Sequence, residues 1–158
     1  MQVVITGGAG MLGKKLAKKL LERGTLAGPD GTQTKIERLI LLDVVEAPDL
    51  PQDPRVSFVA GEVSDASLMR KVIAGDTGSV FHFAAVVSAG AEADFDLGYR
   101  VNLDGTRAVL EACRALPRPP RVVFTSSIAV YGGDLPEVIT DEQKLTPQTS
   151  YGAQKAMG

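Results

Sequence analysis

Short runs of β-branched and other apolar residues alternate with longer stretches in which apolar residues recur every three or four positions. The clearest helical stretch is 11–23, where Leu12, Leu16 and Leu20 lie four residues apart and Gly24 is a natural stop. A short helix is predicted after Asp65, and a long helical pattern runs from the end of a small-residue loop at 85–93 to about Leu116. The apolar runs predict strands at 3–5, 39–43, 56–60, 79–84 and 121–126.

Strands separated by helices predict parallel βαβ units, because a parallel crossover needs about a dozen residues or more. The fold class is therefore α/β, a doubly wound parallel sheet with helices on both faces and no linker that would divide residues 1–158. The polar insertion at 25–35 is predicted to be a surface loop. No helix stop precedes Gly158, so we expect the sequence to end within a helix.

The composition narrows the classes of function. An apolar content of 44% suffices for a core, and 17 lysines and arginines against 19 acids give no basic surface for nucleic acid. No apolar run approaches the roughly 20 residues that span a bilayer. The single cysteine, Cys113, permits no intrachain disulfide, so a cytoplasmic location is expected. No metal, membrane or nucleic-acid partner is predicted.

A glycine-rich turn joins the first predicted strand to the first predicted helix. Gly7 would allow the tight turn, Gly10 would let the backbone approach a pyrophosphate, and Gly13 would let helix and strand pack closely. The free N–H groups of the helix start would bind phosphate oxygens. A plain strand-to-helix turn is the alternative, but the position between strand and helix favours dinucleotide binding. The expected cofactor contacts are Gly7, Gly10, Met11, Leu12 and Gly13.

Asp43 closes the second predicted strand. A carboxylate there can accept hydrogen bonds from the adenosine ribose hydroxyls and would repel a 2′-phosphate. The interval from the glycines exceeds the usual interval of about 20 residues, and the insertion at 25–35 accounts for the excess. An ordinary strand-end aspartate is the alternative. No arginine follows in Val44-Val45-Glu46, so NAD is favoured over NADP.

Six motifs occur in order: TGGAGMLG at 6–13, GEVSD at 61–65, FHFAA at 81–85, VNLDGT at 101–106, TSSIAVYG at 125–132 and YGAQK at 151–155. Together they resemble the extended short-chain dehydrogenase/reductase family, also called the NAD-dependent epimerase/dehydratase family. The resemblance covers all 158 residues and is to the family's N-terminal half. It implies a Rossmann sheet, NAD as cofactor and a C-terminal substrate region that these residues do not include.

The resemblance also implies individual cofactor contacts. Glu62 and Val63 match positions that flank the adenine, although the family usually has aspartate where Glu62 stands. Ala84 and Ala85 match residues that line the dinucleotide.

The resemblance further implies a catalytic set. Ser127, Tyr151 and Lys155 match the family's catalytic serine, tyrosine and lysine, and Asn102 matches a helix asparagine near the site. Asn102, Tyr151 and Lys155 are also expected beside the cofactor. A tyrosine with a pKa of about 10 cannot take a proton at neutral pH unless a cation stabilises its phenolate, and Lys155 is one helical turn from Tyr151. Ser127 would hold the substrate oxygen while NAD accepts the hydride.

Other conspicuous residues have structural interpretations. His82, the only histidine, lies between two phenylalanines in an apolar strand, which favours a packed, hydrogen-bonded role. Cys113 is predicted to be a thiol in a helix core, and Asp65 a helix cap rather than an adenine contact. Ser88, in the loop after the fourth strand, is placed where it could contact substrate or simply belong to the loop.

The sequence leaves the reaction open between oxidation and epimerisation. Sugar-nucleotide dehydratases of the family usually carry a threonine followed by an Asp-Glu pair where this chain has Ser127-Ile128-Ala129, so dehydration is disfavoured. The stretches at 22–26, 36–44 and 84–106 resemble a branch that oxidises D-erythronate, a four-carbon sugar acid, to its 2-oxo acid. A uronate or UDP-sugar enzyme, such as an epimerase, is the alternative, and a non-catalytic NAD-binding module is a third.

The expected partner is thus a small sugar acid or nucleotide sugar, and a homodimer is left open. Recognition of a sugar acid needs a cation, because a carboxylate in a dry pocket requires a charge-assisted partner. Arg100 is the one nearby candidate in sequence and is poorly placed on its helix. An arginine or lysine from outside residues 1–158 is therefore expected, and little turnover is expected from these residues alone.

Overall fold

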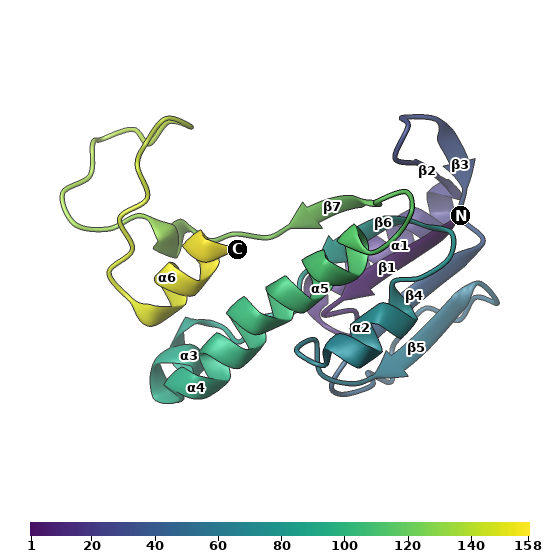
Figure 1. Ribbon diagram of the computed structural model, residues 1–158, viewed down its shortest axis with the longest axis horizontal. Helices are drawn as coiled ribbons and strands as arrows, with labels where there is room; N and C mark the ends of the chain where they lie inside the picture. The colour runs from purple at the N-terminus through teal and green to yellow at the C-terminus, as the bar shows by residue number, and fades with distance from the viewer.

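Five parallel strands form the central sheet in the order β5-β4-β1-β6-β7 (Figure 1). The structure is a computed structural model that describes residues 1–158. The strands are β1 (Gln2–Thr6), β4 (Arg38–Asp43), β5 (Val56–Ala60), β6 (Thr77–His82) and β7 (Arg121–Phe124). Every residue of β1 is buried, because neighbouring strands flank it and helices cover both of its faces. The predicted parallel α/β class is confirmed.

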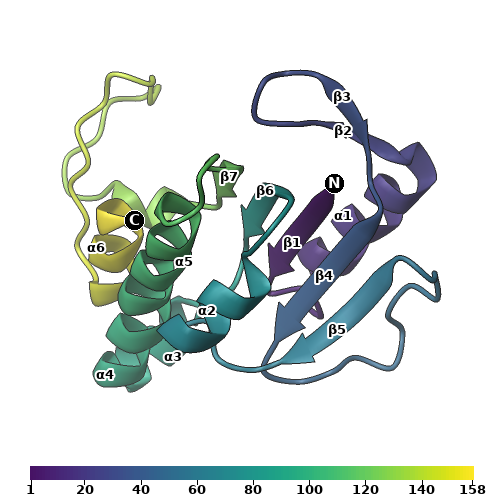
Figure 2. The ribbon, with the colours of Figure 1, turned by 45° about the vertical axis from the view of Figure 1, so that its right-hand side comes forward.

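Successive residues of β1 point into two separate apolar layers. Val4 packs in a cluster with residues of α2 (Ala66–Val72) and α5 (Gly105–Arg114), whereas Val3 and Ile5 pack in a cluster with residues of α1 (Met11–Arg23). Figure 2 shows α2 and α5 in front of the sheet and α1 behind it. None of the helices combines the length and apolarity that a bilayer crossing requires.

Two structural interpretations from the sequence are confirmed. The Asp65 Oδ1 atom accepts hydrogen bonds from the backbone N–H groups of Ser67 and Leu68, at 2.9 and 3.0 Å, and so caps α2. Cys113 is buried in the apolar cluster beneath α5. Its burial raises the pKa of the thiol to about 11, which keeps the sulfur protonated and unreactive.

The prediction of a loop at 25–35 is wrong. The segment forms a hairpin of β2 (Thr25–Ala27) and β3 (Gln33–Lys35), paired antiparallel. Its turn-forming residues are concentrated in the hairpin loop, where Asp30 Oδ1 accepts from the Thr32 N–H at 2.9 Å. The residues on either side of this loop therefore pair with each other as strands.

The predicted loop at 85–93 is also partly wrong, since it contains the short helix α3 (Ser88–Ala93). The strand predicted at 79–84 is shifted toward the N-terminus, since β6 covers Thr77–His82, and the strand predicted at 121–126 is shorter, since β7 covers Arg121–Phe124. β6 stops at His82 because its neighbour β1 ends at Thr6, which pairs with His82. β7 stops at Phe124, the partner of His82 on the other side.

The long helical pattern that reaches Leu116 is one continuous helix with a wider turn in its middle. It consists of α4 (Phe95–Gly98), the π-helical segment η1 (Tyr99–Asp104) and α5, and the junction residues Tyr99 and Gly105 have right-handed helical dihedrals. A π-turn inside a helix often marks a functional position. Here it contains Asn102.

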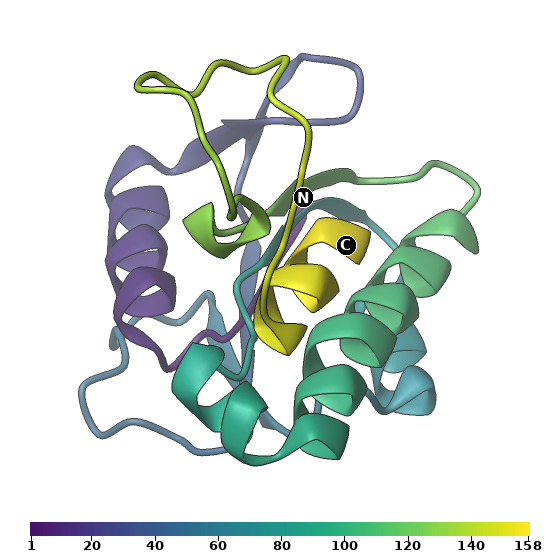
Figure 3. The same ribbon diagram turned by 90° about the vertical axis from the view of Figure 1, so that its left-hand side faces the viewer.

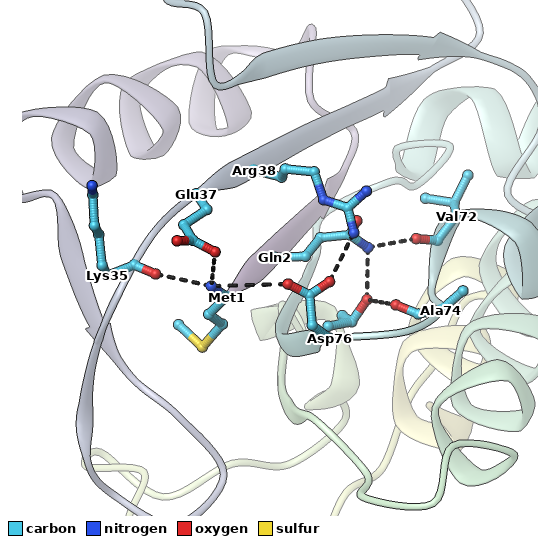
Figure 4. Close-up of polar contacts among 9 residues, drawn as sticks. Met1, Gln2, Lys35, Glu37, Arg38, Val72, Ala74 and Asp76 are labelled. Carbon is cyan, nitrogen blue, oxygen red and sulfur yellow. Dashed lines mark hydrogen bonds and ion pairs between the residues drawn. The ribbon is translucent and has the colours of Figure 1, made fainter.

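Polar contacts tie the strands together at their amino ends (Figure 4). The Gln2 side-chain amide donates to the Val72 carbonyl at 2.8 Å and to the Thr77 hydroxyl at 2.6 Å. Arg38 pairs with Asp76 at 2.7 Å, so β4 is joined to the turn that precedes β6. This edge is opposite the carboxyl ends of the strands, and it stabilises the sheet away from the groove described below.

Candidate functional site

A groove with a cavity volume of about 480 Å³ lies along the carboxyl edge of β1, β4 and β6, where ligands bind in open α/β sheets. Met11, Leu12, Gly13, Asn102, Tyr151 and Lys155 do not line it. The predicted cofactor residues that line it are Gly7, Gly10, Asp43, Glu62, Val63, Ala84 and Ala85.

The sequence missed the apolar residues Val86, Leu97 and Val101 of the groove. Leu97 belongs to α4 and Val101 to η1, so the start of the long helix closes one side. The helical periodicity of this stretch was the available signal, but it does not show which residues face a ligand.

The glycine turn is packed too closely for side chains at Gly7, Gly8 and Gly13, and a Cβ on Gly8 would lie 2.7 Å from the Leu41 Cβ and 2.8 Å from the Leu41 Cα. Gly7 has a φ of +70°, and a Cβ there would lie 2.7 Å from the backbone nitrogen of Ala84. A Cβ on Gly13 would overlap the Gly7 carbonyl oxygen and lie 2.7 Å from the Gly8 Cα. The predicted tight turn is confirmed. Gly13 allows the helix to approach the 7–8 turn itself rather than the body of the strand.

The N-terminus of α1 is open to an anion. Gly10 provides no side-chain cap, and the first turn carries no acidic residue. The first backbone hydrogen bond of the helix runs from Lys14 N–H to the Gly10 carbonyl, at 3.0 Å. The preceding N–H groups, of Met11, Leu12 and Gly13, therefore have no intrahelical acceptor, which fits a pyrophosphate at this helix end.

Asp43 links the end of β4 to the glycine turn. Its Oδ2 accepts from the Ala9 backbone N–H at 3.0 Å, and its Oδ1 accepts from the Val44 N–H at 2.8 Å. These bonds fix the carboxylate at the groove wall while each oxygen keeps a free lone pair for a ribose hydroxyl.

Glu62 is engaged by a cation of this chain. Arg100 Nε lies 3.8 Å from Glu62 Oε2, and both side chains are about half exposed. Arg100 is thus directed to the groove wall that Glu62 forms.

Two of the predicted catalytic residues, Tyr151 and Lys155, lie on α6 (Ser150–Met157) (Figure 3). The other two, Asn102 and Ser127, lie in or next to η1 and the 3-10 turn η2 (Ile128–Val130), which pack against α6. Ser127 caps η2 through a 3.2 Å bond from Ala129 N–H to its Oγ. The neighbouring Ser126 hydroxyl donates to the Lys155 carbonyl at 3.4 Å. Ser127 is therefore brought to the same region as α6.

Lys155 is only 4% exposed, and its ammonium lies 4.5 Å from the centre of the Phe124 ring. Burial lowers the pKa of Lys155 below its ordinary value, because desolvation disfavours the charged form. A cation is thus held in a nearly dry position one helical turn from Tyr151.

Asn102 connects the groove to the same helix. Its side-chain oxygen accepts from the Val86 N–H at 2.8 Å, and its amide donates to the Val86 carbonyl at 2.9 Å and to Gln154 Oε1 at 2.7 Å. Gln154, which lies between Tyr151 and Lys155 in the sequence, is fully buried. The sequence missed Gln154, although its place on the face of Tyr151, three residues away, was a usable signal.

Glu92 of α3 was also missed. Its Oε1 accepts from the Ser150 hydroxyl at 2.8 Å and from the Tyr151 backbone N–H at 2.9 Å. The contact joins residues 59 positions apart, so no local pattern in the sequence could reveal it.

His82 has the predicted packed role. Its ring nitrogens contact the Thr6 hydroxyl at 2.6 Å and the Thr106 hydroxyl at 2.9 Å, and it is 2% exposed. Burial and, with a smaller effect, the positive charge of Lys155 lower the pKa of His82 to about 4. Ser88, the predicted substrate contact, is exposed at the start of α3 and does not line the groove.

The family model described as "NAD dependent epimerase/dehydratase family" matches residues 3–158. The chain is 61% identical to D-erythronate dehydrogenase of Cupriavidus necator, in an alignment that covers 100% of this chain and 48% of the relative. It is 44% identical to D-erythronate dehydrogenase of Haemophilus influenzae, with 99% and 47% covered. The chain thus spans about half the length of the curated relatives it matches.

Among solved structures, the chain is similar to a nucleoside-diphosphate-sugar epimerase from Agrobacterium tumefaciens, with a TM-score of 0.87 and 44% identity. The superposition covers 99% of this chain and 46% of that one. The predicted Rossmann fold and the predicted family resemblance are confirmed.

The position of Asp43 predicts that NAD binds more tightly than NADP, because the 2′-phosphate of NADP would meet a fixed carboxylate. Asp43→Asn should reduce this preference at least about tenfold by removing the charge. Calorimetric titration with both dinucleotides measures the ratio. Glu46→Gln, at an exposed acid that does not line the groove, should leave it unchanged. An unaltered ratio in Asp43→Asn would refute the assignment.

Burial of His82 predicts a stability that depends on pH. The folded-state pKa, about 4, is below the ordinary 6.5, so the unfolded chain binds the proton more readily. The stabilisation is complete above pH 6.5 and is lost as the pH falls toward 4. Urea unfolding should show a loss of about 2 kcal/mol between pH 7 and pH 5.

The variant His82→Gln, which does not titrate there, is the control and should lose much less stability over the same interval. An NMR titration in which the ring of folded His82 gains its proton near pH 6.5 would contradict the prediction.

Proposed function

This chain belongs to the NAD dependent epimerase/dehydratase family, and on that premise we propose that residues 1–158 are the NAD-binding domain of a sugar-acid dehydrogenase. The proposed reaction oxidises a secondary alcohol of D-erythronate, or of a closely similar acid, to the 2-oxo acid. The observation that carries the choice of substrate is the 61% identity with D-erythronate dehydrogenase of Cupriavidus necator over the whole chain.

The residues present fit NAD. The glycine turn leaves backbone exposed where side chains would clash, and the start of α1 has free N–H groups. Asp43 supplies a fixed carboxylate for the ribose, and Ala84 and Ala85 give a shallow apolar wall. When bound, NAD supplies the acceptor for the hydride that leaves the alcohol carbon.

The residues of α6 would remove the alcohol proton. Tyr151 acts as the base in this proposal, because Lys155 places a poorly hydrated positive charge one helical turn away, where it stabilises a phenolate. Ser127 holds the substrate oxygen by a hydrogen bond. Asn102 holds α6 at the groove wall, because it bonds both to Val86 and to Gln154.

The acid group of the substrate needs a cation from another part of the protein. Arg100, the one candidate that the sequence offered, is paired with Glu62 at the groove wall. A free arginine or lysine from outside residues 1–158 is therefore part of the proposal, since a carboxylate in a dry pocket requires a charge-assisted partner.

Nucleotide-sugar epimerisation is the second candidate, favoured by the 44% identity with the epimerase structure from Agrobacterium tumefaciens. Both reactions begin with the same removal of a proton and a hydride from an alcohol. They differ in whether the reduced cofactor is released or returns its hydride to the same molecule.

The full-length protein should therefore reduce NAD when it is given D-erythronate, as measured by NADH absorbance. Tyr151→Phe should lower kcat by about 100-fold or more while its affinity for NAD stays within about threefold, because only the base is removed. Near-normal turnover by this variant would show that Tyr151 is misassigned.

The same preparations, assayed with UDP-sugars, separate the two candidates. Epimerised product without net NADH, and no oxidation of D-erythronate, would overturn the dehydrogenase assignment in favour of the epimerase.

A further inference from the structure

The helix that carries Tyr151 receives an acidic cap from a distant segment. The first turn of α6 contains no acidic residue of its own, and the hydroxyl of its N-cap, Thr149, accepts from the Gly152 N–H at 3.0 Å. The N–H of Tyr151 is bonded instead to Glu92, which belongs to α3. A carboxylate at a helix N-terminus both satisfies a free donor and interacts favourably with the helix dipole.

A single atom makes both contacts of this cap. Glu92 Oε1 accepts from the Tyr151 backbone at 2.9 Å and from the Ser150 hydroxyl at 2.8 Å. The Ser150 hydroxyl also lies 3.4 Å from the Ala91 carbonyl, so it fits into the last turn of α3. The hydrogen bond from the Tyr151 backbone and, with a smaller effect, the one from the Ser150 hydroxyl hold the pKa of Glu92 below its ordinary range.

The segment that carries Glu92 begins in the groove. Ala84, Ala85 and Val86 line the groove, and α3 starts two residues later, at Ser88. Asn102 fixes the same segment from the other side, because it pairs with both backbone polar groups of Val86 and also with Gln154 of α6. The groove wall is therefore attached to α6 at two places, at Tyr151 through Glu92 and at Gln154 through Asn102.

We infer that Glu92 is a positioning residue for the proposed dehydrogenase: its carboxylate holds the backbone of Tyr151 to α3, and so places the tyrosine hydroxyl relative to Ser127 and to a dinucleotide in the groove. The inference rests on the proposed function, in which Tyr151 is the base. Glu92 itself touches neither substrate nor cofactor, and it acts through the helix that it caps.

The test compares three variants of the full-length protein with the wild type. Glu92→Ala removes the acceptor, whereas Glu92→Gln keeps a carbonyl oxygen that can accept both bonds, because both are made to one atom. Asp94→Ala is the matched control: Asp94, two residues from Glu92, caps α4 by accepting from the Leu97 N–H at 2.9 Å and makes no hydrogen bond to α6.

Two measurements are made on each protein. Hydrogen exchange of the Tyr151 amide reports whether the cap is present, and steady-state kinetics with D-erythronate and NAD separate kcat from KM. In Glu92→Ala, the Tyr151 amide should exchange at least about fivefold faster than in the wild type. Its kcat should fall about 10- to 100-fold, and its KM for NAD should change less than about threefold, because misplacement of the base affects the chemical step. Glu92→Gln should restore both, and Asp94→Ala should change neither.

The inference is overturned if Glu92→Ala leaves the exchange of the Tyr151 amide unchanged, or if exchange accelerates without loss of kcat. It is equally overturned if Asp94→Ala lowers kcat as much as Glu92→Ala does, since the effect would then come from general loosening of α3 and α4. If the wild-type protein oxidises no D-erythronate, the proposed function fails, and the amide exchange then decides by itself whether Glu92 holds Tyr151.

Discussion

The close packing of the 7–13 turn against the carboxyl ends of β4 and β6 is the constraint on which the rest of the groove depends. The turn approaches the backbone at Ala84 so closely that Gly7 has no room for a Cβ, and Gly13 brings the start of α1 onto the turn with the same closeness. The same packing places the Ala9 N–H 3.0 Å from the Asp43 carboxylate. The positions of the free N–H groups of the helix, of the Asp43 carboxylate and of the wall at 84–86 are therefore fixed relative to one another.

A continuous series of polar contacts connects the sheet to α6. Thr6, the last residue of β1, contacts His82, His82 contacts Thr106, and the Thr106 hydroxyl donates to the Asn102 carbonyl at 2.7 Å. Asn102 then holds both the groove wall and Gln154. Because these groups are buried and mutually bonded, loss of one would leave its partner unsatisfied, which makes the arrangement rigid. The π-turn at 99–104 is what places Asn102 in the middle of it.

The sequence predicted the fold through its periodicity, and the groove through the glycine turn and Asp43, because each of these signals lies within one short stretch of the chain. It failed where structure depends on pairing between separate segments. The hairpin at 25–35 forms by pairing of two three-residue strands that carry no periodicity, and the ends of β6 and β7 depend on where their neighbouring strands stop. Glu92 was missed for the same reason, since its partner Tyr151 is 59 residues away. The roles proposed for Ser127, Tyr151 and Lys155 came from family resemblance rather than from the physics of the sequence.

Calorimetric titration of NAD into the full-length protein tests most directly whether the backbone packing at Gly13 creates the dinucleotide site. The wild type should bind NAD, and Gly13→Ala should bind it at least about 100-fold more weakly, because its methyl group would displace the turn from α1 and from Asp43. Circular dichroism should show that the variant keeps its helical content. A folded Gly13→Ala variant that binds NAD as tightly as the wild type would contradict the account.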